Sequence, residues 1–220
     1  MEKKICLSWS GGRDSMMMLN ELKRLNEPVE GLLTTFQEGS GKMMMHEVPV
    51  SLVEQQAKAL GLPLFPVWFG EQVDNTEYEK RMAGAVRSLE KENFTHMSFG
   101  DLYLEDIRKY REKQMEQSAL DPLFPLWGKM TSELSQQFLS QGNRAIIVCV
   151  DEEQLDPGFV GREYNEEFLR DLPDAVDPCG ENGEFHSFVF DGPLFQHAVA
   201  FKVGTTYRKW DRFTYVELLG

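Results

Sequence analysis

Several residues near the start of the chain have the chemistry needed to bind a phosphate group. Two adjacent glycines, Gly11 and Gly12, follow a short apolar run and precede a helical pattern, so this turn leaves backbone N–H groups unpaired. These N–H groups, the positive end of the helix dipole and nearby hydroxyls suit a phosphate or pyrophosphate. The spacing fits neither GxxxxGKS/T nor GxGxxG, and a tight turn without a ligand is the alternative interpretation. The polar residues of the segment are Ser8, Ser10, Asp14 and Ser15.

The hydrophobic pattern predicts the elements that position this turn. Strands are expected at residues 5–9, 29–36, 64–69, 95–99 and 145–150, and helices at 14–26, 49–60, 76–93, 102–118 and 131–141. The alternation predicts an α/β fold in which a five-stranded parallel sheet has helices on both faces. Ligands bind at the carboxyl ends of such strands, so we expect the loops at 10–15, 37–46 and 100–101 to converge on one crevice.

The pattern changes after residue 150. A short helix is expected at 165–171, with strands at 186–190, 197–205 and 213–218. We therefore divide the chain into an α/β domain at 1–150, which is expected to bind the nucleotide, and a smaller α+β region at 151–220, which is expected to bind the substrate. No long linker separates them, so the second region is expected to pack on the sheet and close the crevice.

The composition limits the classes of protein to which the chain can belong. Its 220 residues carry a formal net charge of −13, which disfavours an extensive nucleic-acid surface because phosphate neutralisation needs clustered Lys and Arg. No apolar run approaches membrane-spanning length and no signal peptide is recognisable, so we expect a cytoplasmic protein. The three cysteines form no CxxC pair, which argues against a disulfide framework or a zinc site. A homo-oligomer is compatible with these features.

Motifs spread over nearly the whole chain resemble one family. SGGRDS at 10–15 resembles the SGGxDS motif of the PP-loop ATP pyrophosphatases, which split ATP between the α and β phosphates. Further segments are similar to the diphthine-ammonia ligase (diphthamide synthase) branch of that superfamily. They are SWSGGRDS at 8–15, MMMHEVP at 43–49, QAKALGLPL at 56–64, GDLYLEDIRKYRE at 100–112, PLFPLWG at 122–128, FVGRE at 159–163 and CGENGEFHSFVFDGPLF at 179–195.

The resemblance implies an adenine nucleotide alpha hydrolase-like fold and ATP-dependent amide ligation. A substrate carboxylate would attack the α-phosphate, and ammonia would then displace AMP. The implied catalytic residues are Asp14, Arg13, Glu181 and Glu184, the two glutamates binding the acceptor or guiding ammonia. Mg²⁺ would be held in part by Asp14 or Asp101. The residues expected to contact ATP are Ser8, Ser10, Gly11, Gly12, Asp14, Ser15, His46, Gly100 and Asp101.

The acceptor implied by the resemblance is either diphthine on elongation factor 2 or a small carboxylate metabolite. Three positions differ from the usual family pattern, because Arg13 replaces a lysine, Asn182 a glycine and His186 a glutamate. Without the resemblance, Glu181 and Glu184 would be interpreted as a solvated acidic turn. Asp101 would be a helix N-cap and His46 a polar surface residue.

Two other functions are compatible with the loop. A non-catalytic regulator that binds adenine nucleotides would use the same residues. Sulfur insertion into tRNA, known elsewhere in the superfamily, is disfavoured by the acidic balance and the cysteine spacing.

Overall fold

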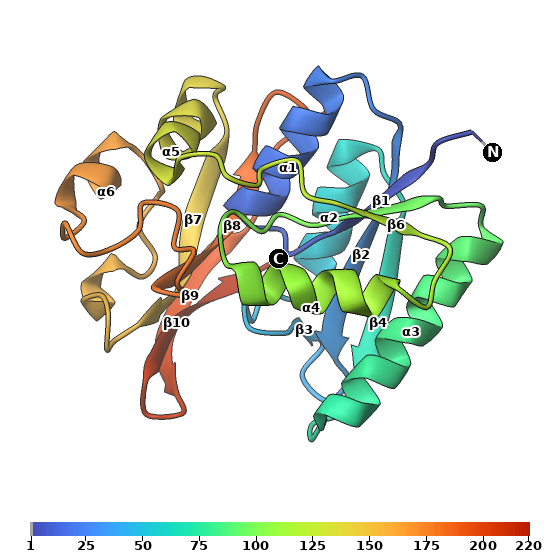
Figure 1. The fold of residues 1–220 in the computed structure, drawn as a ribbon. Coiled ribbons are helices and arrows are strands. Elements are labelled where there is room, and N and C mark those ends of the chain that lie inside the picture. Colours follow the sequence, from blue (N-terminus) through green and yellow to red (C-terminus); the bar gives the residue numbers. More distant parts are fainter. Residues whose placement is uncertain (1) are drawn as a thin grey trace.

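The computed structural model describes residues 2–220 and contains two β-sheets (Figure 1). The first sheet has five parallel strands in the order β4-β2-β1-β5-β6, and a short strand, β3, pairs antiparallel with the end of β2. Its strands are β1 (Ile5–Ser8), β2 (Val29–Gln37), β3 (Lys42–Met43), β4 (Leu64–Phe69), β5 (His96–Ser98) and β6 (Asp121–Leu123). The predicted class, an α/β fold with a five-stranded parallel sheet, is confirmed.

Helices cover both faces of this sheet. They are α1 (Arg13–Arg24), α2 (Val50–Leu60), α3 (Asn75–Lys91) and α4 (Glu105–Met115). Apolar side chains of α1 and α2 belong to one core cluster, and those of α3 and α4 belong to another, because alternate residues of each strand point to opposite faces. Helix α2 ends at Gly61, whose φ of 67° is the left-handed conformation that glycine adopts without strain.

The second sheet is antiparallel, with the order β8-β7-β10-β9. Its strands are β7 (Arg144–Asp151), β8 (Phe185–Asp191), β9 (Lys202–Lys209) and β10 (Phe213–Leu219), accompanied by α5 (Thr131–Ser140), η1 (Pro157–Phe159) and α6 (Glu166–Asp171). The short helix and the three strands expected after residue 150 are all present, although β9 begins later than predicted.

The strand predicted at 145–150 exists, but its assignment to the parallel sheet is wrong. As β7 it pairs antiparallel with β8 and β10. An unbroken apolar run fits a buried strand of either sheet, so the sequence pattern does not select the partner. The fifth parallel strand is β6, three residues that include Pro122 and that were expected to be a loop. The domain boundary at residue 150 stays a prediction, and the pairing of β7 favours an earlier one.

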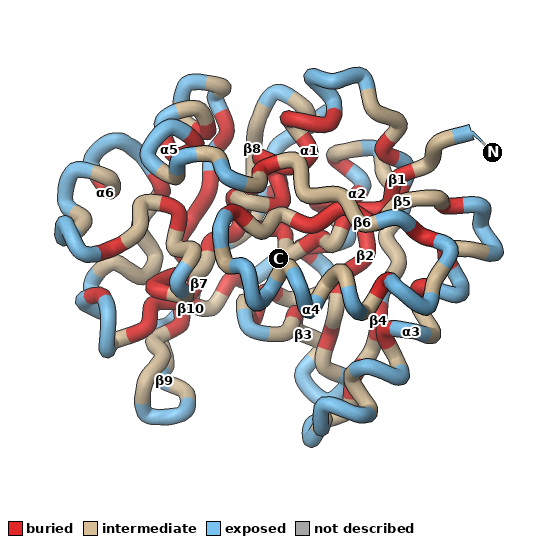
Figure 2. Tube along the Cα trace, viewed as in Figure 1, coloured by how far each residue is buried: buried red, intermediate tan, exposed pale blue. Residues whose placement is uncertain are grey.

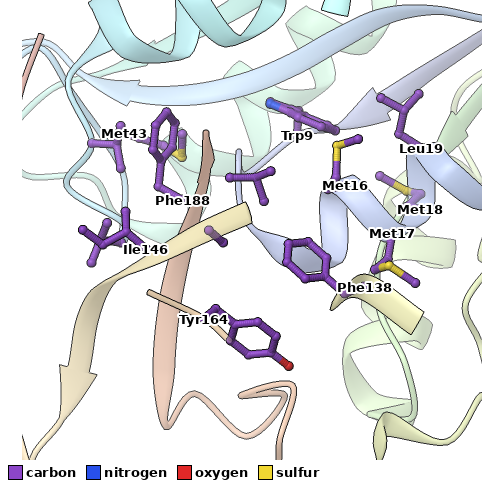
Figure 3. Close-up of a cluster of buried hydrophobic side chains, with 14 of the residues drawn as sticks. Trp9, Met16, Met17, Met18, Leu19, Met43, Phe138, Ile146, Tyr164 and Phe188 are labelled. Carbon is purple, nitrogen blue, oxygen red and sulfur yellow. The ribbon is translucent and has the colours of Figure 1, made fainter. Parts of the chain in front are cut away.

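The two sheets share one core. Figure 3 shows side chains from α1, including Met16 and Met17, beside Phe138 of α5, Ile146 of β7 and Phe188 of β8. Buried residues concentrate along the strands and α1, whereas Met115 is the one buried residue of α4 (Figure 2). Among the described residues no helix is long and apolar enough to cross a membrane. The expected cytoplasmic location stays a prediction.

Candidate functional site

The phosphate loop, which we define as residues 8–15, lies between the carboxyl end of β1 and the start of α1. Gly11 has a φ of 68°, and Gly12 is the N-cap of α1 without any side-chain capping bond. The Ser10 and Ser15 hydroxyls lie 2.9 Å apart, and Ser15 Oγ also accepts from the Ser10 N–H at 2.9 Å. The loop is therefore held by its own hydroxyls, and its helix N-terminus carries the partial positive charge that attracts anions.

A cavity of about 260 Å³, which we call the loop cavity, opens beside the phosphate loop. Ser8 and Ser10 line it from the loop and His46 from the segment after β3. Two helices on the other side contribute Tyr78 and Arg111. The remaining lining residues are Trp9, Leu33, Thr35, Met43, Met44, Met45 and Met82. Two of the three loops expected to converge, at 10–15 and 37–46, thus border one cavity.

Strand β8 of the second sheet is attached directly to the phosphate loop. The Val189 N–H donates to the Gly11 carbonyl at 2.9 Å, and Gln56 Nε2 donates to the carbonyls of Gly11 and Val189 at 3.0 and 2.6 Å. The Arg13 N–H donates to Ser187 Oγ at 3.1 Å. The sequence interpretation missed Gln56 and Ser187. A polar residue on the otherwise apolar face of α2 was the available signal for Gln56.

Arg13 does not face the loop cavity. Its side chain is 1% exposed, and Nη2 donates to the Cys179 carbonyl at 2.9 Å and to the Asp14 carboxylate. Burial disfavours the charged guanidinium, but neighbouring groups, above all Asp14, more than offset this and raise the pKa of Arg13. This position favours a role in joining Asp14 to the second region, and the catalytic role that the resemblance implies for Arg13 stays a prediction.

Carboxylates gather where the phosphate loop meets the second region. Burial raises the pKa of Asp14, and the Asp177 carboxylate adds to the effect against the opposing charge of Arg13. Burial also raises the pKa of Glu181, to about 7, with Asp14 and Asp101 adding to the shift. Glu181 Oε1 accepts the Leu102 N–H at 2.9 Å, so the loop after β5 joins this group. Asp177 was not singled out from the sequence.

The acidic turn, residues 177–184, uses its carboxylates to hold its own backbone. Glu184 is 2% exposed and accepts the N–H groups of Asp177 and Asn182, both at 2.9 Å, and the Asn182 side-chain amide at 3.0 Å. Asp177 Oδ1 accepts the Cys179 N–H at 2.7 Å. Glu184 therefore stabilises the turn, whereas Glu181 contacts the loop after β5. The predicted contact of Glu184 with an acceptor stays untested.

The predicted metal residues fit a magnesium ion that arrives with a polyphosphate. Asp101 Oδ2 is buried and has no hydrogen-bond partner among the described residues. Gly100 packs against Asp14, since a Cβ on Gly100 would lie 3.4 Å from the Asp14 carbonyl oxygen. Residues 2–220 contain no group of three or more His, Cys, Asp or Glu able to hold a metal. Mg²⁺ is commonly bound by one or two carboxylates together with phosphate oxygens and water. Asp14 and Asp101 could supply the carboxylates.

His46 and His186 form a pair of tilted rings next to the phosphate loop. Their ring centroids are 4.6 Å apart with an interplanar angle of 38°. A Cβ on Gly12 would lie 3.4 Å from His46 Nε2, so this imidazole abuts the loop. Burial, with the neighbouring imidazole, lowers the pKa of His46 to about 3, and burial lowers that of His186 to about 4. Both rings are neutral at physiological pH.

The fold and the site define an α/β protein with an anion-binding type of glycine loop at the carboxyl end of the central strand, β1. Models of the diphthamide synthase N-terminal and C-terminal domains match residues 3–122 and 130–218, and the chain belongs to this family. It is similar to diphthine–ammonia ligase from Bos taurus, 29% identical over 213 residues that cover 86% of this chain and 79% of that protein. The Homo sapiens protein is 28% identical with the same coverage.

Among solved structures the chain is similar to the U34-tRNA thiolase NcsA from Methanococcus maripaludis. The TM-score is 0.41 at 15% identity, covering 63% of this chain and 56% of that one. A likeness of this size supports no conclusion about this chain.

Proposed function

We propose that this chain is an ATP-dependent ligase that adenylates a substrate carboxylate and then lets ammonia displace AMP. Family membership and the name of its relatives, diphthine–ammonia ligase, support the reaction class. One observation carries the proposal: Arg13 ties the phosphate loop to the acidic turn, and Glu181 of that turn accepts the Leu102 N–H of the loop after β5. One side suits an anion, and the other suits a cation or an amine.

In the first step the phosphate loop would hold the triphosphate. A carboxylate oxygen of the acceptor attacks the α-phosphorus, and the bond from that phosphorus to the bridging α-β oxygen breaks, so pyrophosphate leaves. The Gly11 N–H and the hydroxyls of Ser10 and Ser15 would donate to the charge that develops on the leaving group, and the Gly12 N–H, which donates to Ser10 Oγ at 3.3 Å, would hold that hydroxyl in place. Adenylation makes the carboxyl carbon an electrophile that a neutral amine can attack.

In the second step the acidic turn would handle ammonia. Ammonium must lose a proton before its nitrogen can attack the acyl carbon and expel AMP. Glu181 has a pKa of about 7 because burial disfavours its ionised form, which places it near the working pH of a general base. Glu184 would keep the turn in shape, and Arg13 would fix Asp14 relative to it.

Mg²⁺ would neutralise phosphate charge, held by Asp14 and Asp101 as the orphaned Asp101 oxygen allows. The first acceptor to test is diphthine on elongation factor 2, because the relatives are named for it. A small carboxylate is the alternative acceptor, and a nucleotide-binding regulator without turnover is the alternative function.

The test is to supply ATP, Mg²⁺ and ammonium with each acceptor and to identify the nucleotide product. We expect AMP and pyrophosphate, formed only when an acceptor is present. ADP with phosphate would contradict cleavage between the α and β phosphates. Tight ATP binding with no turnover on any carboxylate would instead favour the regulator. As a control protein, Asp106→Asn carries an exposed substitution in the first turn of α4, and it should give the same products as the wild type.

A further inference from the structure

The loop cavity has little fixed positive charge for a ligand as anionic as a nucleoside triphosphate. Among its described lining residues, Arg111 is the one permanent cation, and Asp101 is close enough to offset part of that charge. Arg13, the cation of the loop itself, is buried and turned toward Asp14 and the Cys179 carbonyl. The chain as a whole carries a net charge of −13. A further source of positive charge would therefore strengthen binding of a polyphosphate.

His46 is placed to be that source. It lines the cavity, and its Nε2 lies against Gly12 at the start of α1, where a phosphate would sit. Its ring is backed by His186 of β8 at a centroid distance of 4.6 Å. The neighbouring residue, Ser187, accepts the Arg13 N–H, so the strand that carries His186 is anchored to the same loop.

The charged groups around this pair leave it neutral when no anion is bound. Of the described titratable groups, His186 acts on His46, and Asp151 of β7 acts on His186. The Asp151 carboxylate is already paired with Arg212, the residue before β10, at 2.5 Å. Burial disfavours both imidazolium forms, which keeps the pair uncharged.

Two more charged groups near His46 are engaged elsewhere. Glu47, the next residue, forms an ion pair with Lys209 at 2.7 Å and accepts from the Tyr207 hydroxyl at 3.4 Å. No carboxylate among these neighbours faces His46 directly. A bound polyphosphate would thus be the nearest negative charge to its imidazole.

We propose that His46, backed by His186, is a conditional cation of the nucleotide site: it is neutral in the empty cavity and takes up a proton from solvent when a polyphosphate binds. The inference rests on the proposed function only in requiring that the phosphate loop binds polyphosphates. An adjacent anion favours the protonated imidazole. Two imidazoles in contact cannot both be cations without strong repulsion, so the pair takes up one proton. His186 is a positioning residue that holds the His46 ring against the loop.

Proton uptake makes binding stronger as the pH falls. The affinity changes by up to about tenfold per pH unit for each whole proton taken up. A histidine that stayed neutral would leave only the pH dependence of the nucleotide itself. The variant His46→Gln reports that background, because glutamine can still donate a hydrogen bond but does not titrate in this range.

The experiment is calorimetric titration with α,β-methylene-ATP and Mg²⁺ at pH 6.5, in two buffers of different ionisation enthalpy. We expect the wild-type protein to take up about 0.5 to 1 proton more than His46→Gln. His186→Gln should reduce this excess, and the exposed control His197→Gln should keep it. Equal uptake by the wild type and His46→Gln would overturn the inference while leaving the proposed function intact. No binding to the wild type would overturn both.

A second measurement needs no variant that could misfold. The chain has four histidines, so their imidazole signals can be followed by NMR at pH 6.5 with and without the same ligand. We expect one imidazole, that of His46, to change from the neutral to the protonated chemical shift when the protein is saturated with ligand. Signals that all remain neutral with ligand bound would overturn the inference.

Discussion

The phosphate loop and the acidic turn are both glycine-containing turns and are joined by Arg13, yet they satisfy their backbones in opposite ways. Hydroxyls stabilise the phosphate loop, and the Gly11 N–H has no acceptor among the described residues. Carboxylates stabilise the acidic turn, where Asp177 and Glu184 accept several of its N–H groups. The phosphate loop therefore keeps an N–H donor for an anion. In the acidic turn, N–H groups donate to the turn's own carboxylates, and the turn presents negative charge.

This difference shows that glycine spacing alone does not define a phosphate site. A phosphate site also requires that nearby side chains do not accept hydrogen bonds from the turn's N–H groups. Arg13 links the two turns by contacting Asp14 on one side and the Cys179 carbonyl on the other. Variants that act on one turn alone should separate nucleotide binding from the handling of ammonia.

The largest effect is expected at the phosphate loop. Asp14→Asn should lower the rate of AMP formation by about 10³-fold because it removes a proposed Mg²⁺ ligand, and Ser10→Ala by about 10²-fold because it removes a hydroxyl proposed to donate to the leaving phosphates. The measurement is kcat with saturating ATP, beside a far-UV circular dichroism spectrum that shows an intact fold. Full activity in both variants would mean that the loop is only structural.

The next largest effect is expected on the acidic turn. Glu181→Gln should lower kcat by about 10²-fold at pH 7.5, because it removes the proposed proton acceptor. The wild-type rate should also fall as the pH drops below about 7, and this limb should disappear in the variant. A wild-type pH profile without that limb would argue against Glu181 as the base.

The same glutamate makes a prediction about stability. The pKa of Glu181 is raised in the folded protein, so its contribution to stability is present at low pH and is lost as the pH rises through about 7. Glu181→Gln should therefore melt at a higher temperature than the wild type above pH 7 and not at pH 5. Glu184→Gln is the contrasting variant, because that carboxylate accepts three hydrogen bonds within the turn. It should lose about 1–3 kcal/mol of stability both at pH 5 and above pH 7.

Gly12→Ala should weaken ATP binding by about tenfold. Its Cβ would lie 2.9 Å from the Ser187 carbonyl oxygen and 3.4 Å from His46 Nε2, so β8 or the loop must shift. Calorimetric titration with α,β-methylene-ATP measures the change. Gly70→Ala is the matched control, since a Cβ there meets no atom within 4 Å. Equal affinity in all three proteins would show that the contact between β8 and the loop has no influence on binding.

The smallest effect is expected at the outer contact between the two regions. The Tyr103 hydroxyl donates to Asn182 Oδ1 at 3.0 Å, and Tyr103 is 40% exposed. Tyr103→Phe should change kcat/KM by about twofold or less, since an exposed hydrogen bond contributes roughly 0.5 kcal/mol. A change above tenfold would mean that this contact governs access to the crevice.

The sequence predicted the parts of the fold that depend on local pattern. Glycine turns, amphipathic helices and apolar strands are recognisable one segment at a time, so the phosphate loop and most elements were located correctly. The strands that pair with β7 were not predicted correctly, because an apolar run does not indicate which sheet the strand joins. Strand β6 was missed because three residues that include Pro122 have no detectable period.

The candidate site was predictable only where its chemistry is concentrated in a motif. Asp14 and Glu181 lie close enough for the charge of Asp14 to raise the pKa of Glu181, and the roles proposed for these residues and for Ser10 stay predictions. Gln56 and Ser187 act through backbone contacts with distant segments, which spacing does not reveal. The burial of Arg13 depends on the Cys179 carbonyl, contributed by a residue 166 positions away along the chain.

The attachment of β8 to the phosphate loop also sets an order of events during synthesis. The Arg13 N–H can form its hydrogen bond only after Ser187, 174 positions later, has been made, and the Gly11 carbonyl can accept only after Val189 has been made. A ribosome adding about 5–20 residues per second would leave the loop without these contacts for roughly ten seconds or more. The phosphate loop, made before the second sheet, thus reaches its final form only after that sheet, and we expect ATP to bind only once β8 has been made and has paired with the loop.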